Sequence, residues 1–334
     1  MEKHKAIIAI LSILFVFSSS VSAQNILKEK IKKRPQEKKE KSYGADDPEF
    51  SLAHDGIIRK YKVHLPPAYD GKTIFAVVIY IHGGSGDMRA VYMDGVDKAA
   101  DKFGFILAVP EGTGELTFGH LRGVWNGGKW ATGECCGSAD DVGFISKMID
   151  ELKAKFKVDA RRIYATGISN GGLMTNRLGC ELSEKIAAIA TVTPAAVKSE
   201  CQPSRSMPVM NIHGTADPAN PPDGSEPRSI FAKDSGTGFA MPYQRMTPYQ
   251  VVDVWKKINQ CSDKQVAGYE NGAARCVIYN DCAQGSEVVL CMVEGMGHAY
   301  PSGAQYLPAN MVGPVSCDIS FEQIWEFFKK HSLK

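Results

Sequence analysis

The chain has 334 residues, of which 44% are hydrophobic and 23% are charged. This composition excludes a disordered or fibrous chain, and the length suits one large α/β domain or two average domains. The net charge is only +2, but residues 24–42 alone carry +5, so the body from residue 43 onward is net negative. An acidic body argues against nucleic-acid binding, which needs a basic face.

The N-terminus, residues 1–23, has the pattern of a secretory signal peptide. Lys3 and Lys5 precede a twelve-residue apolar run, and the small residues 21–23 offer a cleavage site. An uncleaved membrane anchor is the alternative, but the run is short for crossing a bilayer. We therefore expect a secreted or periplasmic protein with no membrane association after the signal is removed.

Residues 24–45 are rich in Lys, Glu and Gln and lack any apolar period. We expect a solvated, flexible basic tail there, with a tether to an anionic surface as the alternative. The rest of the chain, 46–334, has no internal repeat and no sign of a second core, which predicts a single domain.

Buried-type strands alternate with helical patterns through this domain. The β-branched and aromatic run 74–81 is typical of a strand buried on both faces. Strands of this sequence type that alternate with helices predict an α/β fold, a mostly parallel sheet with helices on both faces. The expected strands are 57–65, 74–81, 105–109, 163–167, 187–192 and 208–212, and the expected helices are 89–103, 140–156, 171–181, 248–259 and 319–331.

Nine cysteines in an exported chain should mostly form disulfides. Two further strands, 274–279 and 287–293, flank a turn, and the simplest hairpin register places Cys276 opposite Cys291, close enough to bridge. A metal site is the alternative, but the sequence has no Cys-x-x-Cys cluster to support it. Cys261 and Cys282 fall near the same hairpin, and the pairing of five others stays open: Cys135, Cys136, Cys180, Cys201 and Cys317.

The most specific motif is Gly167-Ile168-Ser169-Asn170-Gly171, which fits G-x-S-x-G. It follows an expected strand and precedes an expected helix, which is the context that a strained turn presenting a nucleophilic serine requires. Its glycines leave room for that turn, and the helix directs its positive end at the hydroxyl of Ser169. A chance match in a glycine-rich chain is the alternative, and the strand–turn–helix context argues against it.

A nucleophilic serine needs a base, and the base needs an acid to orient it. In hydrolases with this motif the chain order is serine, acid, histidine. Asp217 follows the strand 208–212, and His298 lies in a glycine-rich loop after the strand 287–293. We therefore predict the triad Ser169–Asp217–His298. The other candidates are Asp223 and Glu226 as acids and His213 as the base.

Acyl transfer also needs hydrogen-bond donors for the oxyanion of the tetrahedral intermediate. The strand 74–81 ends in the turn His82-Gly83-Gly84-Ser85-Gly86. We expect one backbone N–H from Gly84 in this turn and a second from Asn170, the residue after the nucleophile. A plain glycine-rich turn is the alternative.

Taken together, these motifs resemble the polyhydroxybutyrate-depolymerase-like and feruloyl-esterase family of secreted α/β-hydrolases. The resemblance implies an α/β-hydrolase catalytic domain over 46–334, the same triad, and no metal or organic cofactor. It also implies an acyl pocket near Trp125 and Tyr300, although many relatives have Trp at the latter position and Cys in place of Gly84. The matching stretches are HGGSGD (82–87), VWNGG (124–128), ECCG (134–137), DDVGFI (140–145), RRIYATGISNGGLM (161–174), HGTADPANPPDG (213–224) and GHAYP (297–301).

The function implied is a secreted serine carboxylesterase that hydrolyses feruloyl- or acetyl-type esters of plant polysaccharide through an acyl-enzyme. Its partner would be a small-molecule or polysaccharide-linked ester. A hydroxyalkanoate oligomer depolymerase is the alternative within the family, and a serine peptidase of the same fold is a third. An inactive binding protein is the non-enzyme alternative, against which the complete triad argues.

Overall fold

The computed structural model describes residues 47–115, 122–130, 133–135, 138–194, 196–197, 200–232 and 245–334. They belong to one compact unit, Gly44–Lys334. The expected signal peptide, 1–23, and the expected tail, 24–45, lie outside the described residues. Within the described ranges, no helix combines the length and the apolar character that crossing a membrane requires.

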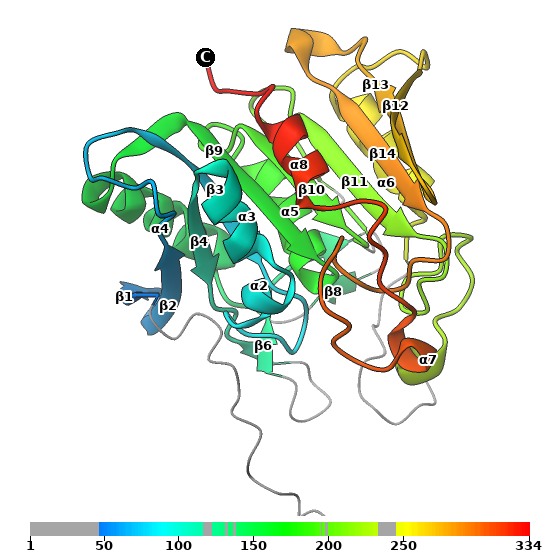
Figure 1. Ribbon diagram of the computed structural model, residues 1–334, viewed down its shortest axis with the longest axis horizontal. Helices are drawn as coiled ribbons and strands as arrows, with labels where there is room; N and C mark the ends of the chain where they lie inside the picture. Colours follow the sequence, from blue (N-terminus) through cyan, green and yellow to red (C-terminus); the bar gives the residue numbers. More distant parts are fainter. Residues whose placement is uncertain are drawn as a thin grey trace, which may run out of the picture. The chain divides into compact units, whose positions relative to one another are not determined.

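A ten-stranded sheet runs through this unit in the order β1-β2-β4-β3-β9-β10-β11-β14-β13-β12 (Figure 1). The six strands from β4 to β14 are parallel, and an antiparallel pair flanks them at each edge. Two small hairpins, β5 (Gly114–Glu115) with β6 (Arg122–Val124) and β7 (Gly128–Trp130) with β8 (Gly133–Cys135), lie outside it. The bounds in the large sheet are β1 (Glu49–His54), β2 (Ile57–His64), β3 (Phe75–Ile81), β4 (Ile106–Pro110), β9 (Val158–Ile168), β10 (Ala188–Val192), β11 (Val209–Gly214), β12 (Val266–Asn271), β13 (Ala274–Tyr279) and β14 (Val288–Val293).

Helices cover both faces of the sheet, so each face has its own hydrophobic core (Figure 1). Along β3, Val78 and Tyr80 join one core while Val77 and Ile79 join the other, because successive side chains point to opposite faces. The expected α/β class with a mostly parallel sheet is thus confirmed. The first core contains α2 (Ala90–Met93), α3 (Val96–Phe103) and α8 (Phe321–Phe328), and the second contains α4 (Asp141–Lys155), α5 (Asn170–Glu181) and α6 (Pro248–Ile258).

Three expected element boundaries were wrong, and two edge strands were not predicted. The helix expected over 89–103 is divided into α2 and α3, because Gly95 at the junction has a φ of 70°. The helix expected over 319–331 begins only at Phe321, where Ser320 accepts a hydrogen bond as the N-cap. Strand β9 starts at Val158, five residues earlier than expected, and its polar first half lacks the apolar run that predicts a buried strand. The edge strands β1 and β12 were missed because neither has a run of buried apolar residues: buried and exposed positions alternate in β1, and most side chains of β12 are exposed. Short elements complete the chain: η1 (Ser229–Phe231), η2 (Ala283–Gly285) and α7 (Ala309–Val312).

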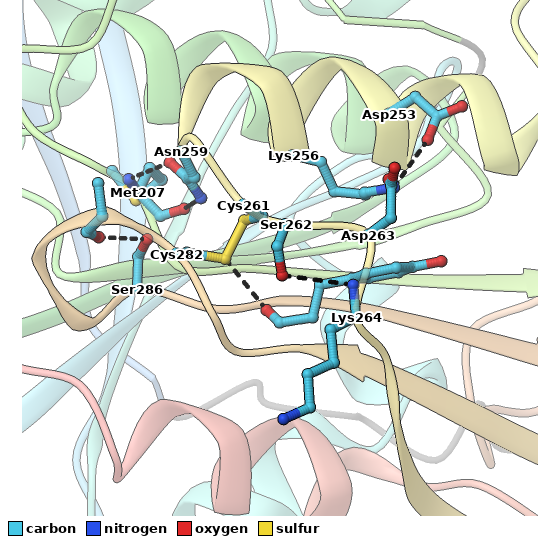
Figure 2. Close-up of a disulfide and its surroundings, with 12 residues drawn as sticks. Met207, Asp253, Lys256, Asn259, Cys261, Ser262, Asp263, Lys264, Cys282 and Ser286 are labelled. Carbon is cyan, nitrogen blue, oxygen red and sulfur yellow. Dashed lines mark hydrogen bonds and ion pairs between the residues drawn. A yellow bond between two sulfur atoms is a disulfide. The ribbon is translucent and has the colours of Figure 1, made fainter.

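The expected hairpin disulfide is confirmed. Cys276 on β13 lies opposite Cys291 on β14, their Cα atoms are 4.0 Å apart, and their sulfur atoms are bonded. Cys261, just after α6, is bonded to Cys282, so the end of α6 is tied to the β13–β14 connection (Figure 2). Cys180 is bonded to Cys201, and Cys317 is free and exposed. The side chains of Cys135 and Cys136 lie outside the described part of the chain.

The Cys276–Cys291 disulfide should contribute measurably to stability. It closes a loop with a sequence separation of 15 residues, and a closure of that size is worth about 3 kcal/mol in the chain-entropy model. We expect Cys276→Ala/Cys291→Ala to lower the free energy of unfolding in urea by about that amount. Cys317→Ser is the control and should leave the free energy unchanged. Equal stability of the double variant and the wild type would contradict the prediction.

Candidate active site

Ser169 lies at a sharp turn between β9 and α5, with a φ of 57° and a ψ of −122°. This conformation is strained for a residue other than glycine. The turn packs directly on the end of β3: a Cβ added to Gly167 would lie 2.6 Å from the Gly171 carbonyl oxygen and 2.7 Å from that of Ile81. The Ser169 N–H donates a 2.9 Å hydrogen bond to the Val192 carbonyl at the end of β10. Both glycines of the motif are therefore required by close backbone packing.

A cavity of about 240 Å³ adjoins Ser169. Five of the residues singled out from the sequence line it together, although they come from three separate segments of the chain. Trp125, expected beside the acyl group, is not among the lining residues. The five are Gly84, Ser169, Asn170, His298 and Tyr300.

Asp217 and His298 form a buried pair beside this cavity. The Nδ1 atom of His298 lies 2.9 Å from one carboxylate oxygen of Asp217, and the backbone N–H groups of Ala219 and Asn220 donate to the other at 2.8 and 2.9 Å. Burial opposes ionisation, but His298 and these donors outweigh it and hold the pKa of Asp217 below its ordinary value. An ionised carboxylate can only accept, so Nδ1 carries the proton and Nε2 presents a lone pair. This is the tautomer that a general base needs.

The rival acid and base residues occupy other positions. The ring of His213 is buried, its Nε2 atom lies 2.8 Å from the Asn220 carbonyl oxygen, and the same nitrogen is 3.8 Å from the Asp217 carboxylate. Burial lowers the pKa of His213, with Asp217 partly opposing it, so a neutral ring donates to the loop that carries Asp217. Asp223 and Glu226 are exposed and are not among the residues that line the cavity.

The two expected oxyanion donors are neighbours. A Cβ added to Gly84 would lie 3.4 Å from the Cβ of Asn170. Asn170 is the first residue of α5, so its backbone N–H lies outside the intrahelical hydrogen-bond pattern. The Gly84 N–H has no acceptor among the described residues. This pair of backbone donors beside Ser169 has the composition of an oxyanion hole.

One wall of the cavity is aromatic. The ring of Tyr300 is buried and packs edge-to-face on Tyr80 with centroids 5.6 Å apart, and its hydroxyl lies 3.0 Å from the Thr166 hydroxyl. The Tyr80 hydroxyl donates to Asp94, and desolvation raises the pKa of that carboxyl to about 7, with the Tyr80 hydrogen bond opposing it. Sequence analysis missed Tyr80 and Asp94. Tyr80 could have been found as the residue two before the His82 turn on a buried strand, whereas no motif marks Asp94.

Comparison with known proteins places these features in context. No family model matches the sequence. Feruloyl esterase B of Piromyces equi is 31% identical over 252 residues, covering 73% of this chain and 43% of that protein. A bifunctional acetylxylan esterase/xylanase of Neocallimastix patriciarum is 25% identical over 238 residues, covering 71% of this chain and 28% of that protein. This chain therefore spans less than half of each of these two relatives.

A solved acetyl xylan esterase from Aspergillus awamori superposes with a TM-score of 0.55 over 84% of this chain and 99% of that chain, at 13% identity. The chain is therefore similar to feruloyl esterases, as its motifs predict, and it has the α/β-hydrolase fold. The expected fold is thereby confirmed, and the serine turn, the Asp217 loop and the His298 loop all follow the carboxyl ends of parallel strands, where active sites of open α/β sheets lie.

Proposed function

We propose that this feruloyl-esterase-like protein is an exported serine carboxylesterase with Ser169 as nucleophile, His298 as base and Asp217 as the acid that orients it. The observation that carries the proposal is that Ser169, on its strained turn, and His298, held by Asp217, line one cavity. The order of the three residues along the chain is also the order found in α/β-hydrolases.

The proposed reaction has two stages, acylation of Ser169 and hydrolysis of the acyl-enzyme. The Nε2 atom of His298 takes the proton of the Ser169 hydroxyl as its oxygen attacks the ester carbonyl, and the N–H groups of Gly84 and Asn170 stabilise the oxyanion. The imidazolium, stabilised by the Asp217 carboxylate, then protonates the departing alcohol and leaves an acyl-enzyme. His298 next deprotonates a water molecule, which attacks the acyl group and releases the acid and Ser169.

For the substrate we propose feruloyl- or acetyl-type esters of plant polysaccharide. The names of the relatives, a feruloyl esterase and acetylxylan esterases, support this class. Between the two acyl groups, the cavity favours the feruloyl group, because Tyr80, Tyr300 and Phe231 supply aromatic surface that a planar ring can contact. The three disulfides among the described residues suit an oxidising compartment, which supports export with removal of residues 1–23.

Ser169→Ala tests the mechanism. Loss of the nucleophile from such a triad costs on the order of 10⁶ in kcat, so turnover of 4-nitrophenyl acetate and methyl ferulate should vanish. The variant should keep the wild-type circular dichroism spectrum and melting temperature. Mass spectrometry should also find a fluorophosphonate probe on Ser169 in the wild type and on no residue in the variant. Activity near the wild-type level in Ser169→Ala would refute the proposal.

Asp217→Asn tests the assignment of the acid. An amide can donate to the Nδ1 atom of His298 and so favour the wrong tautomer, which should lower kcat by about 10⁴. Asp223→Asn is the matched control, because Asp223 is exposed and lies away from the cavity. A mild effect of Asp217→Asn with a severe effect of Asp223→Asn would mean that the acid is Asp223.

Tyr300→Ala tests the acyl group. Aromatic pairing is worth about 0.5–1.5 kcal/mol beyond the area it buries, so kcat/KM for methyl ferulate should fall by about threefold to tenfold more than kcat/KM for 4-nitrophenyl acetate. Tyr300→Phe keeps the ring and loses only the hydroxyl, so it should retain the wild-type preference. Equal losses on both substrates in Tyr300→Ala would remove the argument for an aromatic acyl group.

A further inference from the structure

The two oxyanion donors of the proposed esterase belong to different elements, so something must fix their spacing. Gly84 lies in the turn after β3, and Asn170 begins α5. We infer that Trp125 is a positioning residue that joins these two segments and thereby sets the geometry of the oxyanion hole. This inference rests on the proposed function and goes beyond it, because it gives Trp125 a role other than the substrate contact that the family resemblance implied.

The backbone of Trp125 holds the Asn170 side chain from both ends of its amide. The Trp125 N–H donates to the Asn170 Oδ1 atom at 2.8 Å, and the Asn170 Nδ2 atom donates to the Trp125 carbonyl oxygen at 3.1 Å. Paired bonds of this kind fix both the position and the orientation of an amide. Because Asn170 is the first residue of α5 and lines the cavity, they also fix the position of its backbone N–H beside the cavity.

The indole of Trp125 holds the other segment. Its Nε1 atom donates a 3.0 Å hydrogen bond to the His82 carbonyl oxygen, and the two rings are in contact with centroids 4.9 Å apart. The His82 ring is fixed in turn, since its Nδ1 atom bonds the Gly83 carbonyl oxygen at 2.8 Å and its Nε2 atom accepts from the Gly112 N–H at 3.1 Å. Burial lowers the pKa of His82 to about 4, so the ring is neutral at physiological pH and can fill both roles. The Gly84 N–H therefore sits on a turn that Trp125 anchors.

The backbone that follows Trp125 is itself held in place by hydrogen bonds. The N–H of the next residue, Asn126, donates to Asp141 at 2.7 Å, and Asp141 is paired with buried Arg59 at 2.6 Å. Arg177 donates to the Asn126 carbonyl oxygen at 2.8 Å. The Trp125 side chain is fully buried and does not line the cavity, so it can act only through Asn170 and His82.

Trp125→Phe removes the bond to His82 and keeps most of the apolar volume. Loss of a whole oxyanion donor costs about 10²–10³ in kcat, and displacement of one should cost less. We therefore expect kcat for 4-nitrophenyl acetate to fall by about tenfold or more, with KM changed by less than about threefold. Binding of an aryl trifluoromethyl ketone, whose adduct with Ser169 carries an oxyanion, should weaken by the same factor as kcat/KM.

Trp255→Phe is the matched control. Trp255 is also fully buried in the second core, and its indole also makes one hydrogen bond, at 2.9 Å to Asn176. Asn176 lies on α5 six positions after Asn170, so this bond holds neither Asn170 itself nor the turn after β3. It should lose a similar amount of stability, measured as the urea midpoint, with kcat and ketone affinity unchanged. This comparison separates a positioning effect from a general packing defect.

Asn170→Ala provides a second route if Trp125→Phe does not fold. It removes both bonds to the Trp125 backbone but keeps the Asn170 N–H, and it should lower kcat and ketone affinity in the same way. The inference is overturned if Trp125→Phe behaves like Trp255→Phe, if it raises KM alone as loss of a substrate contact would, or if Asn170→Ala is as active as the wild type. An active Ser169→Ala would instead overturn the proposed function itself.

Discussion

The structure of the site depends on one close backbone contact, between the serine turn and the end of β3. In the parallel register Ile81 pairs with Gly167, and the Gly167–Gly171 segment approaches the Ile81 carbonyl so closely that neither glycine leaves room for a side chain. This contact brings the turn after β3 beside Ser169, the proposed nucleophile. Ser169 and the proposed oxyanion donors are thus neighbours as a consequence of strand pairing, and only their fine spacing remains to be set by side chains.

A second pairing brings Asp217 and His298, the proposed acid and base, together across 81 positions of sequence. Strand β11 pairs with β14 up to Gly214 and Val293, and the two following loops continue the contact. The Ala216 N–H donates to the Met296 carbonyl oxygen at 2.9 Å, and a Cβ on Gly214 would lie 2.9 Å from the Gly297 carbonyl oxygen. Backbone contacts therefore hold the Asp217 and His298 loops together independently of their side chains. Because the backbone of both loops is already ordered, the hydrogen bond between the two side chains costs little further conformational entropy.

Sequence analysis predicted those features of the fold that depend on continuous patterns of residues along the chain. The central strands are buried on both faces and read as apolar runs, and the Cys276–Cys291 register followed from the hairpin alone. The serine turn and the Asp217 and His298 loops could be located because each follows such a strand. The edge strands β1 and β12 could not be located in this way, since neither sequence has a continuous apolar run. Trp125 shows a different limit: a motif shows that a residue matters, but whether its ring faces a cavity or the core depends on packing that no local pattern records.

The two cores on opposite faces of the sheet support different parts of the site. Tyr80 and Tyr300, which shape the cavity wall, belong to the core under α2, α3 and α8, whereas Trp125 belongs to the core under α4, α5 and α6. Polar groups beneath Trp125, such as the Arg59–Asp141 pair, are buried at a desolvation cost that an apolar core would avoid, and what they gain is a fixed geometry. On the opposite face, the cavity wall is shaped by the Tyr80–Asp94 and Tyr300–Thr166 contacts. Under the proposed function, the acyl preference would therefore depend on residues of one core, and the geometry of the oxyanion donors on residues of the other.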